Sequence, residues 1–225
     1  MKPRSMRTLA WAIVFSQCLI AVQANDKPSF VAGDLIVKFT AASEPGTLVT
    51  RATQGDQAAH RQLATLAARL SQELGVAIAA VRVTSGNELV LSVDRDRLAQ
   101  SLRQVVTSDP AVHAVTRIDP PKTVLPAAQL ALALDLRRDS EADRLVRRTA
   151  RAGKQTSNEI EALVKKLCAG AVPQPSGRVS NRGQLVLTID IAKLTLELIE
   201  RLKRRPDVEY AQPSHIVKPY PGASP

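Results

Sequence analysis

Hydrophobic and polar positions follow one order along the first half of the chain. Apolar side chains at every second position of residues 35–39 predict a half-buried strand. Residues 63–70 then carry apolar side chains at the i, i+3, i+4, i+7 spacing of a helix face. Two β-branched runs, residues 76–83 and 88–93, predict a pair of strands. The order therefore begins strand, helix, strand, strand.

The segments between and after these two strands predict a hairpin, a capped helix and a last strand. Ser85-Gly86-Asn87 has the residue types of a tight hairpin turn. Asp94 is placed to cap a helix whose apolar stripe runs through residues 98–106, and Pro110 ends that helix. Residues 111–115 form a short final strand. The sequence strand, helix, strand, strand, helix, strand is the split βαβ, or ferredoxin-like, arrangement.

The whole pattern occurs twice. Residues 89–112 align with residues 185–208 without a gap, and the matching positions are apolar, acidic or proline in both copies. Such internal self-similarity indicates a repeated structural unit. We therefore predict an α+β protein of two tandem ferredoxin-like βαββαβ domains, residues 29–122 and 127–219. Each should have an antiparallel sheet with two helices on one face.

The first 24 residues have the features of an export signal. A basic start precedes the apolar stretch 9–22, which is too short and too poorly flanked to span a bilayer, and small residues end it at 22–24. We predict a signal peptide over residues 1–24 and an exported mature chain, periplasmic or extracellular, beginning near Asn25. Once the signal is removed, the protein is expected not to associate with a membrane.

The mature chain contains one cysteine and a moderate positive charge. Cys18 leaves with the signal, so Cys168 has no internal disulfide partner, and we interpret it as a small apolar residue near a helix end. A reactive or intermolecular thiol is the alternative. The formal net charge is +10, and the signal contributes three basic residues and no acids, which leaves +7.

Neither the basic runs nor the central strands indicate nucleic-acid binding. The run at 201–205 lies in the last turn of a predicted helix, where cations oppose the negative end of the macrodipole. A second basic group is interpreted as part of a solvated loop and comprises Arg147, Arg148, Arg151 and Lys154. The predicted central strands, residues 89–93 and 185–189, have no aromatic side chain on which a base could stack. We therefore predict no nucleic-acid partner.

The residues with potential chemistry do not form a recognisable reactive group. His60, His113 and His215 fall on separate elements, and Cys168 has no second soft ligand near it in sequence, so no metal site is predicted. The sequence has neither a glycine-rich phosphate loop nor a nucleophile with a base at a known spacing. The protein is predicted to use no cofactor and not to be an enzyme.

Both ends of the repeated unit resemble the propeptides of subtilisin-like proteases. Gly33-Asp34-Leu35-Ile36-Val37-Lys38-Phe39 is similar to their first strand, and Pro206-Asp207-Val208-Glu209-Tyr210-Ala211-Gln212-Pro213 is similar to their last. In that family the propeptide templates the folding of the protease, packs its sheet over two surface helices of the enzyme and lays its C-terminal tail in the active-site cleft. No catalytic domain is recognised in these residues. The resemblance therefore implies a stand-alone inhibitor, or a chaperone acting in trans, of a subtilisin-like serine protease.

The resemblance also assigns roles to the end of the second copy. Tyr220 would fill the primary specificity pocket and Val217 the apolar pocket three residues upstream. Lys218 would point outward, and Pro219 would keep the segment extended. Pro221 follows the position of the scissile bond and lacks an amide N–H, so the tail should be cut poorly. Residues 220–225 are predicted to be a proline-rich tail, and a disordered terminus without a partner is the alternative.

Two positions depart from the family, and two other functions remain open. Gln212 and Ser214 stand where the family often has acids that cap the protease helices, so these two residues are possible contacts to those helices. The first copy continues from Asp119 directly into the second, and we interpret its tail as a linker. The chain is alternatively a secreted or periplasmic module that binds peptides or proteins by adding a strand to its sheet edge. A remnant prodomain array with a scaffolding role is a third interpretation.

Overall fold

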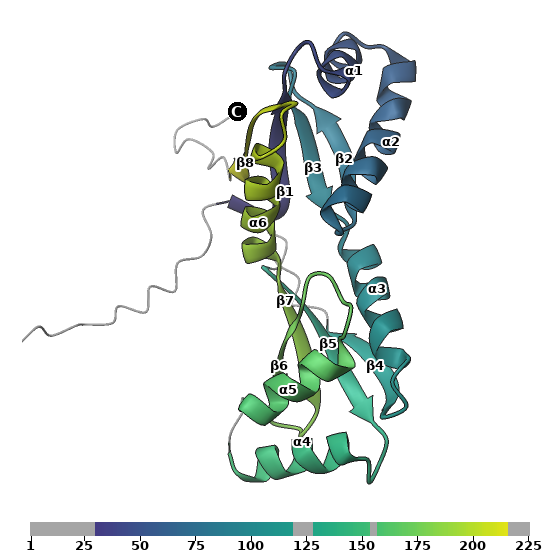
Figure 1. The fold of residues 1–225 in the computed structure, drawn as a ribbon, viewed down its shortest axis with the longest axis vertical. Helices are drawn as coiled ribbons and strands as arrows, with labels where there is room; N and C mark the ends of the chain where they lie inside the picture. Colours follow the sequence, from purple (N-terminus) through teal and green to yellow (C-terminus); the bar gives the residue numbers. More distant parts are fainter. Residues whose placement is uncertain (1–29, 119–127, 154–156, 216–225) are drawn as a thin grey trace, which may run out of the picture.

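A computed structural model describes residues 30–118, 128–153 and 157–215, which form eight strands and six helices in two four-stranded antiparallel sheets. The α+β class predicted from the sequence is therefore confirmed. The two sheets follow one another along the long axis of an elongated molecule (Figure 1).

The repeat seen in the sequence is also a repeat of secondary structure. The first copy contains β1 (Phe30–Phe39), α1 (Glu44–Thr53), α2 (Gln57–Leu74), β2 (Ile78–Val83), β3 (Leu89–Val93), α3 (Arg95–Thr107) and β4 (Val112–Ile118). The second contains β5 (Gln129–Leu136), α4 (Glu141–Arg151), α5 (Asn158–Leu167), β6 (Ser176–Val179), β7 (Leu185–Asp190), α6 (Ile191–Lys203) and β8 (Val208–His215). Every predicted strand and helix is present. Each copy has one further helix, α1 or α4, which the periodicity did not predict.

The additional helix α4 corrects one prediction. Arg147, Arg148 and Arg151 were expected in a solvated loop, but they belong to α4, which Ser140 caps by accepting a hydrogen bond from the backbone N–H of Asp143. Ala142, Val146 and Thr149 form the buried side of the helix. This stripe is short and weakly apolar, so it gave little hydrophobic signal in the sequence. Lys154 lies outside the described residues.

The predicted caps and turns are confirmed. Asp94 accepts a hydrogen bond from the N–H of Arg97 at 3.0 Å, and Asp190 accepts one from Lys193 at 2.9 Å. Each carboxylate satisfies a free N–H group at the start of its helix. In the first hairpin Asn87 adopts a positive φ of 56°, a left-handed conformation that asparagine tolerates well.

The sheets do not follow the boundary between the repeats. The first sheet has the strand order β2-β3-β1-β8, and the second has the order β4-β5-β7-β6. The last strand of each copy thus pairs with the first strand of the other copy. The predicted segments 29–122 and 127–219 are repeats in sequence and in element order, but neither supplies all four strands of a sheet.

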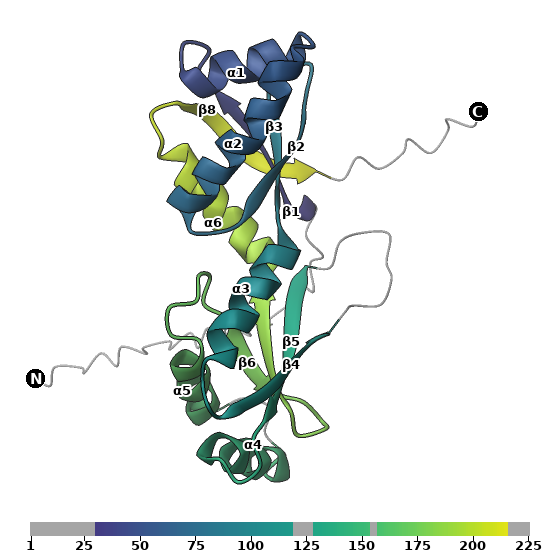
Figure 2. The same cartoon turned by 90° about the vertical axis from the view of Figure 1, so that its right-hand side faces the viewer.

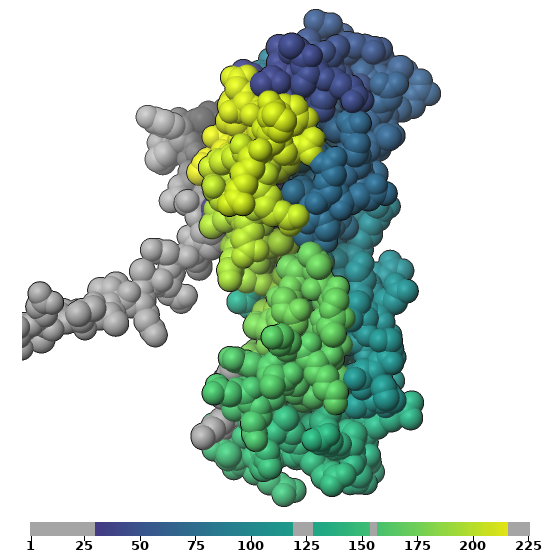
Figure 3. Space-filling model, in the orientation of Figure 1, coloured from purple at the N-terminus to yellow at the C-terminus, as the bar shows by residue number. Residues whose placement is uncertain are grey.

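The helix before each exchanged strand also packs on the sheet of the other repeat. Helix α6 leaves the second sheet and packs on β1 and β8 of the first, where α6 and β8 lie against the first copy (Figure 3). The N–H of Gly33 in β1 donates to Oγ1 of Thr195 in α6 at 2.9 Å, and this bond is buried. Gly33 has a φ of 102°, a conformation that side chains rarely adopt. The glycine therefore turns its N–H toward the helix of the other repeat.

Arg201 of α6 and Arg205, which follows the end of this helix, both contact the C-terminal end of α2. Arg201 donates from Nη1 to the carbonyl oxygen of Leu74 at 2.6 Å, and Leu74 is the last residue of α2. The guanidinium of Arg205 forms an ion pair with Glu73 and a second one with Asp207 at 2.9 Å. A cation at the last carbonyls of α2 favourably opposes the negative end of that helix. The contacts with Leu74 and Glu73 join one repeat to the other.

The core is one continuous cluster that covers both sheets. Leu35, Leu91, Leu132 and Leu187 are fully buried at the centres of their strands. Most of the helical mass lies on one side of the strands (Figure 2). In β1, β3, β5 and β7 the fully buried leucines face that side, and the opposite face of each sheet has no helix among the described elements.

Truncation of the two central leucines should reveal their burial. We expect Leu91→Ala or Leu187→Ala to lower the free energy of unfolding by about 2–5 kcal/mol, because each leaves a cavity in a close-packed core. The measurement is chemical denaturation of the mature chain. Val81→Ala is the control, because 57% of Val81 is exposed and its loss should change stability by no more than about 0.5 kcal/mol. Equal effects at all three positions would contradict this description of the core.

Candidate functional site

Strand β8 forms one edge of the first sheet and carries both predicted contact residues. Ala211 pairs with Val37 and is buried toward the helices, whereas Gln212 pairs with Ile36 and is exposed. Because successive side chains of a strand point to opposite faces, Gln212 lies on the helix-free face. Ser214 comes two residues later and is half-buried. The structure thus places Gln212 and Ser214 at neighbouring positions on the face that has no helix.

The predicted tail follows this strand directly. Strand β8 ends at His215. The tail residues lie outside the described residues and are Val217, Lys218, Pro219, Tyr220 and Pro221.

The centre of the helix-free face is apolar and partly covered. Ile36 pairs with Val90 on one side and with Gln212 on the other, so the three side chains form one row across the sheet. Val90 is only 3% exposed although it lies outside the main core cluster, and Ile36 is half-buried. Asp34 and Ser92 form the next row, and the Ser92 hydroxyl donates to Oδ1 of Asp34 at 2.6 Å. This face therefore combines an apolar strip with hydrogen-bonding groups, as protein-binding surfaces commonly do.

A polar cluster built from both repeats lies at one end of the same face. The Tyr210 hydroxyl donates to Glu88, whose other carboxylate oxygen accepts a hydrogen bond from Thr84 at 2.6 Å. The ammonium of Lys38 lies 5.8 Å from the centre of the Tyr210 ring, within the range of a cation–π interaction, and 3.8 Å from Glu209. Tyr210 comes from the second copy and Lys38 and Glu88 from the first, so the exchanged strand completes the cluster.

The ionisation of this cluster follows from its hydrogen bonds. Bonds from Thr84 and then Tyr210 lower the pKa of Glu88, because they favour the carboxylate. The same contact with Glu88 raises the pKa of Tyr210 to about 12, because the carboxylate holds the hydroxyl proton. At neutral pH the cluster thus contains Glu88 as a carboxylate and Tyr210 as a neutral phenol. It is suited to fixing the position of the β8 edge.

The other residues considered for chemistry lie apart from this face. Cys168 is fully buried at the end of α5, and burial raises the pKa of its thiol to about 11, which makes it a poor nucleophile. The interpretation of Cys168 as a small buried residue at a helix end is confirmed. His60, His113 and His215 belong to α2, β4 and β8. Within the described ranges, no three His, Cys, Asp or Glu side chains are grouped so that they could hold a metal ion.

Sequence reasoning missed the Lys38–Glu88–Tyr210 cluster for a specific reason. The alternation in β1 and β8 could have placed Lys38 and Tyr210 on polar faces. It could not have shown that the two strands are neighbours, because a contiguous repeat would pair β1 with β4. The cluster therefore depends on the exchange of strands.

The comparisons with known proteins identify no relative. No protein-family model, no curated protein and no solved structure matches this chain. Among the residues described, no helix has the length and apolar character needed to cross a membrane.

Proposed function

We propose that the protein is an exported inhibitor, or a folding chaperone acting in trans, of a subtilisin-like serine protease, and that it does not itself catalyse a reaction. The observation that carries the proposal is the position of β8. This strand is similar in sequence to the last strand of subtilase propeptides, and it lies at the edge of a helix-backed sheet directly before the tail.

The strand order supports the proposed domain type. A ferredoxin-like unit places its fourth strand beside its first, and its third between its first and second. The order β2-β3-β1-β8 is this arrangement with the fourth strand supplied by the other repeat. The order β6-β7-β5-β4 is the reciprocal case. We therefore propose two composite ferredoxin-like units.

The helix-free face of the first sheet is the proposed docking surface. Ile36, which is half-buried at the centre of this face, would pack on two surface helices of the protease, whereas Val90 beside it is already covered. Gln212 and Ser214 would then lie near the N-termini of those helices, where side-chain oxygens can accept hydrogen bonds from free N–H groups. The segment after His215 would continue from the β8 edge into the cleft, with Tyr220 in the primary specificity pocket.

The exchange of strands implies one protease for each chain. Only β8 precedes the predicted tail, and β8 belongs to the first sheet. The equivalent strand β4 belongs to the second sheet and is followed by the segment that leads to β5. The composite first sheet is therefore proposed as the inhibitory unit, and both repeats are needed to build it.

Removal of the tail should separate folding from inhibition. Deletion of residues 217–225 should leave the unfolding transition unchanged, because these residues follow the last strand, but should abolish or greatly weaken inhibition of a subtilisin-like enzyme. Tyr220→Gly should weaken inhibition by about 1.5–3 kcal/mol by emptying a pocket. Pro221→Ala should leave initial inhibition intact but make it temporary, because the bond after Tyr220 then becomes cleavable. The measurement is progress curves against a panel of purified subtilases.

Two results of this assay would contradict the proposal in different ways. Equal inhibition by the full chain and the tail deletion would show that the sheet binds without the tail. Absence of inhibition or assisted refolding with every subtilase would instead favour a module that binds peptides by strand addition at a sheet edge.

Charges placed at Gln212 should test the orientation of the docking surface. We expect Gln212→Glu to strengthen inhibition and Gln212→Lys to weaken it, each by about two- to fivefold at low salt, because a helix N-terminus attracts a carboxylate and repels an ammonium. Thr116 is the control, because it aligns with Gln212 in the repeat but belongs to the second sheet. Its Glu and Lys variants should inhibit like the unmodified chain. Opposite charges with the same effect at Gln212 would exclude a helix N-terminus as its partner.

A further inference from the structure

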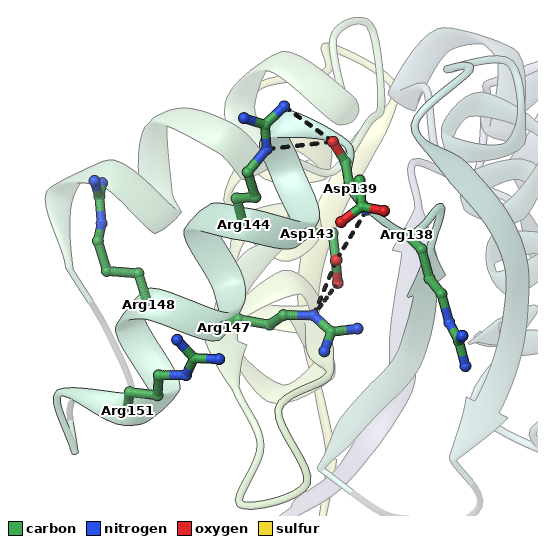
Figure 4. Close-up of a pocket in the computed structure, with 7 residues that line it drawn as sticks. All are labelled: Arg138, Asp139, Asp143, Arg144, Arg147, Arg148 and Arg151. Atoms are coloured by element: carbon green, nitrogen blue, oxygen red, sulfur yellow. Dashed lines mark hydrogen bonds and ion pairs between the residues drawn. The ribbon is translucent and has the colours of Figure 1, made fainter.

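Helix α4 presents a row of arginines to solvent. Arg144, Arg147, Arg148 and Arg151 recur at the i, i+3, i+4, i+7 spacing and are all exposed. Together with Arg138 from the segment before the helix, they line an open hollow of about 900 Å³ (Figure 4). The buried side of α4 packs into the core through Val146 and Thr149, so the helix cannot turn its arginines away.

The acids around this hollow neutralise only part of its charge. Arg147 directs its Nε to both carboxylate oxygens of Asp143 at 2.9 Å, which raises the pKa of Arg147, and it uses neither terminal nitrogen in doing so. Arg148 pairs with Glu159 at 3.0 Å. Arg144 instead donates to the carbonyl oxygen of Asp139, at 3.2 and 3.0 Å, which leaves its positive charge without a carboxylate.

Two further arginines have no acidic partner in the described chain. Arg138 and Arg151 line the hollow from opposite ends, and neither guanidinium makes an ion pair or hydrogen bond with another described residue. The five guanidinium groups of the hollow thus outnumber the acids near them, which are Asp139 and Asp143 in its lining and Glu159 beside Arg148. Arg148 and Arg151 in the last turn do favour the helix by opposing its macrodipole. That effect does not account for Arg138 or Arg144, which lie before the last turn.

We propose that this arginine-lined hollow is a binding site for phosphate groups. A guanidinium presents two parallel N–H donors, which match two oxygens of a phosphate, and it is less strongly hydrated than an ammonium. Several such groups around one hollow can contact different oxygens of the same ligand. None of the described residues that line the hollow is aromatic, so the ligand is recognised by its oxyanions and not by a ring. The site is on α4, at the end of the molecule away from β8 (Figure 1).

Calorimetric titration of the mature chain with tripolyphosphate tests this site without any protease. We expect the double variant Arg144→Gln/Arg151→Gln to bind tripolyphosphate at least about 10-fold more weakly, because it loses two positively charged guanidinium groups that can each donate two hydrogen bonds to a phosphate. The matched control is Arg61→Gln/Arg103→Gln, which removes the same charge from exposed positions on α2 and α3. This control should bind within about twofold of the unmodified chain. All four positions are exposed, so both variants should keep the unmodified unfolding transition.

A second pair of measurements identifies the source of the phosphate. Arg144→Lys/Arg151→Lys keeps both positive charges but removes the paired N–H donors of the two guanidinium groups. This variant should bind tripolyphosphate several-fold more weakly than the unmodified chain. Co-sedimentation with phosphatidylglycerol vesicles that is lost in the Gln variant of α4 would identify a lipid headgroup. Binding of tripolyphosphate without vesicle binding would identify a free phosphate compound. Failure of the unmodified chain to bind either probe, or an equal loss in the Arg61/Arg103 control, would overturn the proposal.

Discussion

The pairing of β1 with β8 is the contact on which the rest of the structure depends. It joins the start of the first repeat to the end of the second, with the register Ile36 to Gln212 and Val37 to Ala211. Because an edge strand without a neighbour leaves its N–H and C=O groups unpaired, each sheet is complete only when the other repeat contributes its last strand. The tail that we propose for the protease cleft is therefore held by the first repeat, although it is encoded at the end of the second.

Differences between aligned residues explain why α6 and not α3 covers the first sheet. Thr195 aligns with Ala99, which has no hydroxyl to accept the N–H of Gly33. Arg201 and Arg205 align with Val105 and Asp109, and an aspartate at the C-terminal end of α2 would meet the negative end of the helix dipole and Glu73. A buried N–H left without a partner costs about 1–3 kcal/mol. These differences favour the exchanged arrangement over two self-contained repeats.

Much of the local structure could be predicted, whereas the pairing between distant segments could not. The alternation at Leu35 to Phe39 and the caps at Asp94 and Asp190 depend on neighbours in sequence, and these predictions are confirmed. The order of elements also repeats, as the match between residues 89–112 and 185–208 predicts. Periodicity reports which face of a strand is buried but not which strand lies beside it. The Lys38–Tyr210 contact was therefore beyond sequence reasoning. The arginine row on α4 could have been found from its spacing. The helix itself was not predicted, because the opposite side of α4 has too few apolar residues to give a helical hydrophobic pattern.

Disulfide trapping in the mature chain, in which Cys168 is the one native cysteine, tests the exchange of strands most directly. Ile36→Cys/Gln212→Cys, with Cys168→Ala to remove the native thiol, places two cysteines at directly opposed positions of β1 and β8 on the solvent-facing side of the sheet. Ile36→Cys/Thr116→Cys is the equivalent pair for contiguous repeats, because Thr116 aligns with Gln212. Mild oxidation should give an internal disulfide in the monomer of the first variant and none in the second, as detected by mass spectrometry of peptides. A disulfide between residues 36 and 116 and none between 36 and 212 would show that each repeat folds by itself, and would contradict the account.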